Sequence, residues 1–77
     1  MDEKPEGARE ARLQRALDHS GRAAILEVLK DEGGELTAEE IQSQLPMSLT
    51  LARIEYHLRV LAAHGLVVQR GSSYGSP

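Results

Sequence analysis

The feature that most constrains the fold is a helix pattern that runs directly into a strand pattern, in LARIEYHLRVLAAHGLVVQR from Leu51 to Arg70. Apolar side chains recur in steps of three or four residues, at Leu51, Ile54, Leu58 and Leu61. This spacing places them on one face of an α-helix. Gly65 is typical of a helix end, and the β-branched residues after it predict a strand. We therefore expect an amphipathic helix, capped by Ser48 or Thr50, that leads into a β-hairpin.

Three further helices are predicted before this segment. An apolar stripe at Leu13, Ala16 and Leu17 predicts a helix from Ala8 to about His19. Ser20 can cap a second, strongly apolar helix that ends at Gly33-Gly34. Thr37 and Glu40 form a T-x-x-E capping box for a short third helix that stops before Pro46.

The predicted fold is therefore mainly α with a small β-hairpin, as four helices followed by a short wing. With 77 residues, the chain makes one small domain. Residues 1–7 have no apolar periodicity and are expected to be a disordered tail, which leaves 8–77 as the domain. Without Trp or Phe, the core must be built from Leu, Ile, Val and Ala.

The charge distribution is more informative than the net charge of −3, which by itself disfavours a nucleic-acid partner. Six of the twelve acidic residues lie between Glu27 and Glu40, whereas the C-terminal third is weakly basic. We interpret the acidic middle as a solvent-exposed face, with a docking surface for a basic partner as the alternative. Basic side chains also form a row at Arg9, Arg12 and Arg15, interpreted as a solvated face, with phosphate contact as the alternative.

Several functional classes are disfavoured. The chain has no cysteine, and His57 and His64 lie about 10 Å apart along a helix, too far for one tetrahedral ion, so no metal or cofactor is expected. No nucleophile–base pair or glycine-rich phosphate loop is present, so we do not expect an enzyme. Neither a membrane span nor a signal peptide is predicted, and we expect a cytoplasmic protein without membrane partners.

Two helices joined by a turn, the second one exposed and followed by a hairpin, are typical of a winged helix-turn-helix. The segments ALDHSGRAAILEVLKDEG, LTAEEIQSQL and IEYHLRVLAAHGLV resemble, in order and spacing, the ArsR-like bacterial winged-helix transcription regulators. This resemblance covers residues 16–70. It implies a repressor-like protein that binds double-stranded DNA in a sequence-specific manner by inserting the helix at about 50–64 into the major groove.

The resemblance also implies the DNA-binding residues. Those on the helix are Thr50 at its start and Ala52, Arg53, Tyr56 and Arg59 on its exposed side. Those in the wing are Arg70, Ser72 and Ser73. Arg53 is the candidate for reading a guanine through two hydrogen bonds, and Arg59 for a phosphate contact.

Some residues depart from the family pattern. Leu51 and Ala52 stand where small polar residues are usual, and Glu55 would be repelled by nearby phosphates. The C-terminal dimerisation helix of the family has no counterpart, so a homodimer would use the first helix, the wing or another surface. These departures favour the alternative function, a winged helix that binds a protein partner without specific DNA binding.

Overall fold

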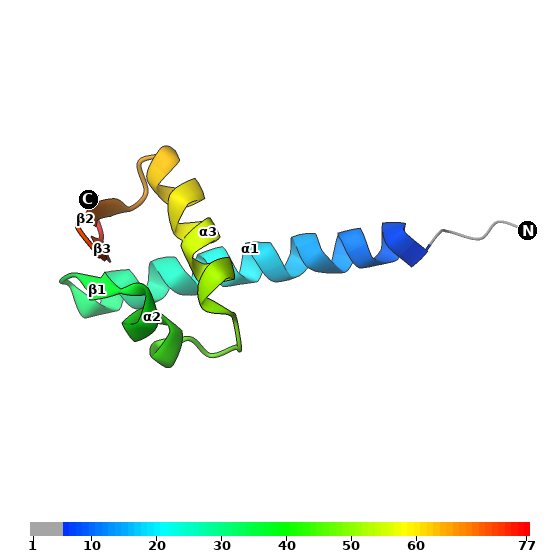
Figure 1. The fold of residues 1–77 in the computed structure, drawn as a ribbon, viewed down its shortest axis with the longest axis horizontal. Coiled ribbons are helices and arrows are strands. Elements are labelled where there is room, and N and C mark those ends of the chain that lie inside the picture. The colour runs from blue at the N-terminus through cyan, green and yellow to red at the C-terminus, as the bar shows by residue number, and fades with distance from the viewer. Residues whose placement is uncertain (1–5) are drawn as a thin grey trace, which may run out of the picture.

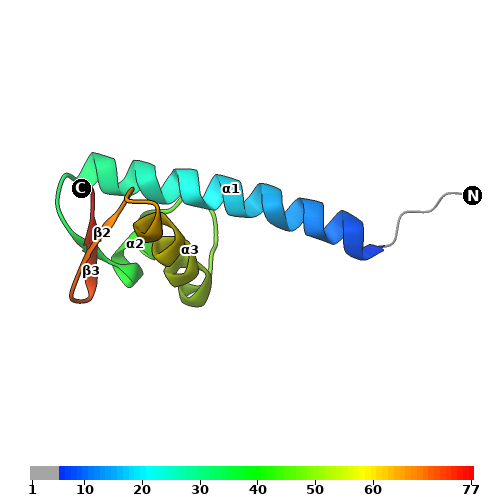
Figure 2. The same cartoon turned by 90° about the horizontal axis from the view of Figure 1, so that it is seen from above.

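The computed structural model describes residues 6–77, apart from the side chains of residues 6–10, 13, 14, 16 and 17. Within them, α1 spans Glu6–Glu32, α2 Ala38–Gln44 and α3 Leu51–Ala63. The strands are β1 (Leu36–Thr37), β2 (Val68–Arg70) and β3 (Ser73–Gly75). Figures 1 and 2 show that α3 crosses α1 steeply, and that the N-terminal half of α1 projects beyond the rest of the fold.

The prediction of two helices before Gly33 is wrong, because α1 is a single helix of 27 residues. Ser20 does not cap a new helix, and Gly21 lies inside α1. Glycine in a helix interior costs about 1 kcal/mol relative to alanine. Here it permits close packing, since a Cβ on Gly21 would lie 3.1 Å from Leu49 Cδ1 and 3.5 Å from His57 Nε2.

Two expectations fall on parts of the chain that the structure does not describe. The side chains of the apolar stripe Leu13, Ala16 and Leu17 are among them. The expected tail 1–7 is also among them, except that Glu6 and Gly7 are the first residues of α1.

The helix boundaries after α1 follow the local signals in the sequence. The capping box of α2 is formed: Thr37 N donates to Glu40 Oε1 over 2.8 Å, and Glu40 N donates to Thr37 Oγ1 over 3.2 Å. At the end of α3, Gly65 has a φ of 74°, and Leu66 N donates to the carbonyl oxygen of Leu61 over 2.9 Å. Both boundaries are therefore confirmed.

The wing belongs to a three-stranded antiparallel sheet with the order β1-β3-β2. Val68 pairs with Gly75 and Arg70 with Ser73, while Leu36 of β1 pairs with Tyr74. The expected short wing is thus formed, with Ser73–Gly75 as its second strand. β1 was not predicted, because a two-residue strand directly before a capping box carries no periodicity of its own.

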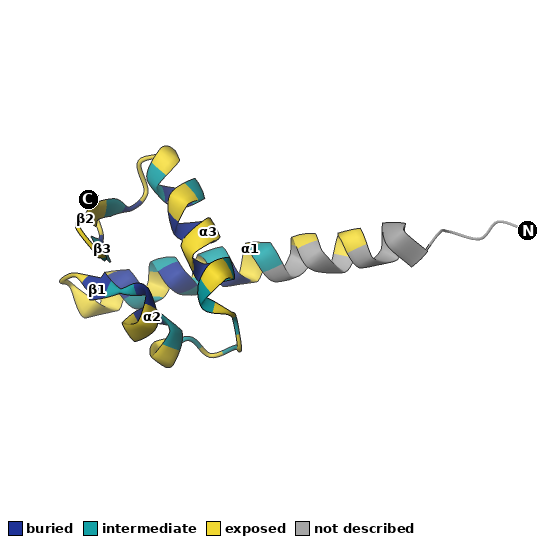
Figure 3. Ribbon diagram, in the orientation of Figure 1, coloured by how far each residue is buried: buried dark blue, intermediate teal, exposed yellow. Residues whose placement is uncertain are grey.

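The core lies where the C-terminal half of α1, α2, α3 and the sheet meet (Figure 3). Its buried hydrophobic residues are all aliphatic: Ile25, Leu29, Leu36, Ala38, Ile41, Ile54, Leu58, Leu61 and Val67. This core fixes α3 by one face and leaves its opposite face in solvent. None of the described helices is long and apolar enough to cross a membrane.

Candidate nucleic-acid interface

The N-terminus of α3 is held by Thr50. Its backbone is extended, and its hydroxyl oxygen accepts a hydrogen bond from Arg53 N over 3.2 Å. Such a cap satisfies one of the free amides in the first turn of a helix. Thr50 is exposed, but its hydroxyl oxygen is already used within the protein. The sequence placed Thr50 correctly at the start of the helix.

The remaining residues of α3 divide into a core face and an outward face. Ile54, His57, Leu58 and Leu61 are buried. The exposed side chains are Ala52, Glu55, Tyr56, Arg59 and Ala63. At 100° per residue, Ala52, Tyr56, Arg59 and Ala63 fall within a narrow sector opposite the core. Three of the predicted contact residues, Ala52, Tyr56 and Arg59, therefore share the outward face.

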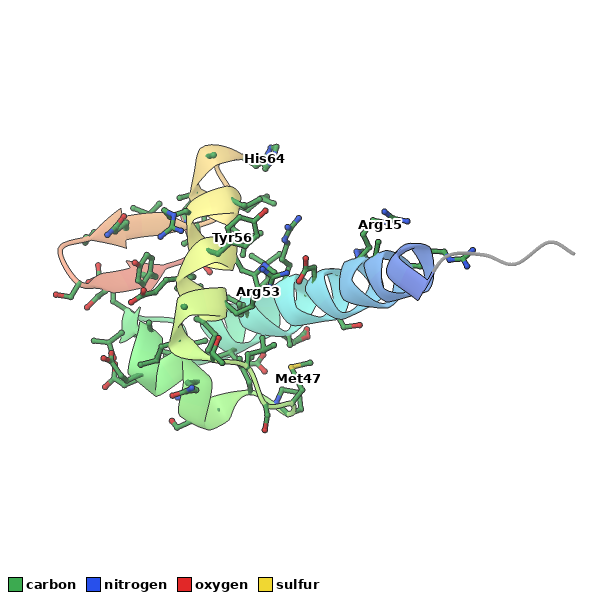
Figure 4. All side chains as sticks on the ribbon, turned by 45° about the vertical axis from the view of Figure 1, so that its right-hand side comes forward. Arg15, Met47, Arg53, Tyr56 and His64 are labelled. Atoms are coloured by element: carbon green, nitrogen blue, oxygen red, sulfur yellow. The ribbon has the colours of Figure 1, made fainter. Side chains whose placement is uncertain are left out.

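Arg53 does not lie on the outward face but on the flank of α3 next to α1. Its Nη2 donates to both carboxylate oxygens of Asp18, over 2.9 Å each. The guanidinium carbon also lies 5.3 Å from the centroid of the Tyr56 ring, within the range of a cation–π contact. The Arg53 side chain remains 36% exposed. It is thus accessible from solvent, but part of its donor capacity is used by α1 (Figure 4).

His57 lies directly behind this pair and is fully buried. Arg22 Nε donates to His57 Nδ1 over 3.1 Å, so the ring proton is on Nε2. Nε2 lies 3.5 Å from Asp18 Oδ1 and has no hydrogen-bond partner. Burial lowers the pKa of His57 most strongly; Asp18 raises that pKa, and Arg22 and Arg53 lower it, with a net lowering. The histidine is therefore neutral at pH 7.

Asp18 and Arg22 are functional candidates that the sequence analysis missed. Each is separated by 35 residues from its partner on α3, and no local pattern connects the two segments. Asp18 belongs to the segment DHSG, which was interpreted as a helix end. Only the packing of α1 against α3 places this carboxylate beside Arg53.

The wing brings its predicted residues to one end of the β2–β3 hairpin. Arg70 ends β2, Ser72 lies in the turn, and Ser73 opens β3. Gly71 has a φ of 62°, which allows the tight turn. Arg70 is 68% exposed, and its Nη1 lies 3.3 Å from Glu35 Oε2. Exposed ion pairs of this kind contribute little energy, so this arginine can change partners.

Half of the acidic residues cluster in one part of the sequence. The acidic residues predicted as a solvent face are all exposed, at Glu27, Asp31, Glu32, Glu35, Glu39 and Glu40. They lie on the C-terminal end of α1, the following loop and α2. Glu55 is the acid beside that face, and between the described side chains of Glu55 and Arg59 no ion pair forms.

No group of three or more side chains suited to hold a metal ion occurs among the described residues. His57 is enclosed in the core, while His64 is exposed at the C-terminal cap of α3. The two histidines therefore have separate surroundings.

Comparison with protein families gives one match that spans the interface. Residues 17–70 match the model of a helix-turn-helix domain family. The matched region covers more than half of the chain and includes α2, α3 and β2. A comparison with curated proteins found no match.

Proposed function

The chain belongs to a helix-turn-helix domain family, and from this premise we propose that it is a transcription regulator that binds specific double-stranded DNA sequences through α3. An α-helix with its side chains is about 10–12 Å wide, and the major groove of B-DNA is about 12 Å wide. The exposed outward face of α3 carries this proposal.

Each residue on the outward face has a chemistry that suits a groove. Ala52 is small and apolar, as a contact with a thymine methyl group requires. Arg59 is exposed and has no carboxylate partner within the described chain, so it can donate to a phosphate or a guanine. Tyr56 is 40% exposed and can donate its hydroxyl to a phosphate.

The ion pair with Asp18 limits how Arg53 can contact DNA. Reading a guanine requires two donors on one edge of the guanidinium, and Nη2 is bound to Asp18. Arg53 therefore reads a base only when it leaves Asp18, or else it contacts DNA through Nη1 and Nε.

In the wing, Arg70 and Ser72 are exposed and suited to phosphate contact, with Ser73 at the start of β3.

The resemblance to the ArsR-like regulators supports a more specific proposal. The protein would be a repressor-like regulator in the cytoplasm of a bacterium, without catalytic activity. Most of the acidic cluster lies outside α3 and the wing, although Glu35 is paired with Arg70 of the wing.

A second candidate is a winged helix that binds a protein partner. It is favoured by the internal ion pairs of two predicted DNA-contacting cations, Arg53 with Asp18 and Arg70 with Glu35. In this case the half-buried Leu49 and Leu51, at the start of α3, would provide apolar contact. Binding would then tolerate Arg59→Ala and fail when Leu49 or Leu51 is made polar.

The test is selection of bound duplexes from a random library, followed by fluorescence anisotropy on a selected and a scrambled duplex. Arg59→Ala should weaken binding to both duplexes, and the log–log dependence of affinity on salt should become shallower by about 0.9 if Arg59 meets a phosphate. Arg59→Lys, which keeps the charge, is the matched control and should keep the slope.

NMR titration with the selected duplex locates the contact. The amides of residues 52–59 and of the β2–β3 turn should shift. If no duplex is selected and these amides also stay unmoved when a random-sequence duplex is added at low salt, DNA binding is ruled out and the protein-binding candidate is the one to test.

A further inference from the structure

The projecting half of α1 carries a row of basic side chains that continues the candidate interface. Arg12, Arg15 and His19 are exposed, and Arg22 is half-buried at the crossing with α3. Their spacing of three, four and three residues keeps them on one side of the helix. Because α1 is a single helix, this row extends without interruption from the free half of α1 to α3.

Contacts at the crossing show which way this row faces. Arg22 Nε binds His57, and the Arg22 guanidinium carbon lies 5.9 Å from the centroid of the Tyr56 ring, on the outward side of α3. The row therefore borders the flank of α3 that carries Tyr56. Figure 4 shows Arg15 on the free half of α1, on the side towards which α3 rises.

The steep crossing of α1 and α3 indicates where the row would lie relative to a bound duplex. When α3 lies in the major groove, the groove runs along α3 and therefore across the line of α1 (Figures 1 and 2). Only one helix fits the width of the groove. The projecting half of α1 then points across the line of the sugar–phosphate strand that borders the groove.

The charges on this row match that strand. Arg15 lies two helical turns from Arg22, about 10 Å along the axis, and Arg12 lies one turn further. Asp18 is the carboxylate near this row among the described side chains, and it is bound to Arg53. The row thus presents cations to solvent beside the site where phosphates would lie.

We propose that Arg12 and Arg15 on the projecting half of α1 contact the phosphate backbone of double-stranded DNA beside the groove that α3 enters. This proposal rests on the proposed function of α3. It adds a second element to the interface and assigns a role to the length of α1. Because phosphates carry no base identity, these contacts strengthen binding to all sequences alike.

The test compares the wild-type protein with the double variants Arg12→Gln/Arg15→Gln and Arg12→Lys/Arg15→Lys, by anisotropy over a series of salt concentrations. Each lost phosphate contact lowers the log–log slope by about 0.9. The Gln variant should therefore show a slope smaller by about 1.8 and an equal loss of affinity for specific and random duplexes. The Lys variant, which keeps the charges, should keep the wild-type slope.

Circular dichroism and light scattering accompany the titrations. Unchanged helicity and unchanged mass in the Gln variant, together with the smaller slope, support the proposal. A wild-type slope in the Gln variant overturns the proposal while the proposed function stands. A change of mass without a change of slope identifies the row as a contact between two copies and also overturns it. Absence of DNA binding by the wild-type protein removes the proposed function and this proposal together.

Discussion

At the scale of single residues, Asp18 controls how much of the basic surface of α3 is free. Its two oxygens accept from the Nη2 of Arg53, and it also faces His57. A carboxylate beside a DNA interface opposes the phosphates and occupies a cation that could bind them. Arg53 therefore exchanges one anionic partner for another when DNA binds, and this exchange reduces its net contribution to affinity.

Replacing Asp18 by Asn tests this exchange. The variant keeps a side-chain oxygen that can accept from Arg53 but loses the charge, so DNA binding at low salt should become tighter. The free energy of unfolding should fall by about 1 kcal/mol or less, as expected for a partly exposed ion pair. Anisotropy and urea unfolding measure the two effects. Weaker DNA binding by this variant would show instead that Asp18 holds Arg53 in the conformation that contacts DNA.

His57 is the residue whose protonation couples pH to stability. Burial lowers its pKa in the folded protein below the ordinary 6.5. As the pH falls through 6.5, the unfolded chain binds a proton that the folded protein still excludes, so stability decreases with falling pH. The loss continues down to the pKa of the folded state, and its slope reaches at most about 1.4 kcal/mol per pH unit.

We therefore expect the urea concentration at the unfolding midpoint of the wild-type protein to decrease when the pH is lowered from 7.5 to 5.5. In His57→Gln, which cannot titrate at this site, the midpoint should be lower overall and should depend less on pH in this range. His64→Gln, a change at an exposed histidine, serves as the control and should keep the wild-type dependence. An equal pH dependence in His57→Gln and the wild-type protein would contradict the role of His57.

At the scale of elements, local signals predicted most boundaries after α1. The capping box of α2, the Thr50 cap of α3 and the Gly65 end of α3 all formed. These signals succeed because caps satisfy free backbone groups within a few residues. The break expected at Ser20-Gly21 failed for the opposite reason, since the packing of Leu49 and His57 against Gly21 lies outside any local window.

The end of α1 provides a test of the backbone argument with a built-in control. Gly33 has a φ of 72° and its N–H donates to the carbonyl oxygen of Leu29, whereas the neighbouring Gly34 has no positive φ. A Cβ at either position meets nothing within 4 Å. Gly33→Ala should thus destabilise the protein by about 1–2 kcal/mol through backbone strain alone.

Gly34→Ala is the matched control. It adds the same methyl group in open space without that strain, and should leave stability unchanged or raise it by a few tenths of a kcal/mol, because alanine restricts the unfolded chain. Thermal unfolding followed by circular dichroism compares the two variants. Equal effects at the two positions would contradict the strain argument.

At the scale of the whole molecule, the long α1 sets the shape. The radius of gyration is 14.4 Å, larger than the about 11.5 Å expected for a compact chain of this length. The excess comes from the projecting half of α1, on which the described side chains of Arg12 and Arg15 are exposed. Half of the twelve acidic residues lie between Glu27 and Glu40, at the other end of α1, in the loop after it and in α2. A net charge of −3 therefore coexists with a basic side that suits a polyanion.

The sequence by itself determined the helix that crosses the core, the strand after Gly65, the capping box and the aliphatic core. All of these depend on periodicity or on hydrogen bonds between near neighbours. The family resemblance placed Ala52, Arg53, Tyr56 and Arg59 on one exposed face; the structure keeps Ala52, Tyr56 and Arg59 there and places Arg53 on the flank next to α1. Only the tertiary structure decided that α1 is continuous and that Asp18 binds Arg53, because these outcomes depend on side chains 28 to 36 residues apart that meet only when α1 and α3 pack.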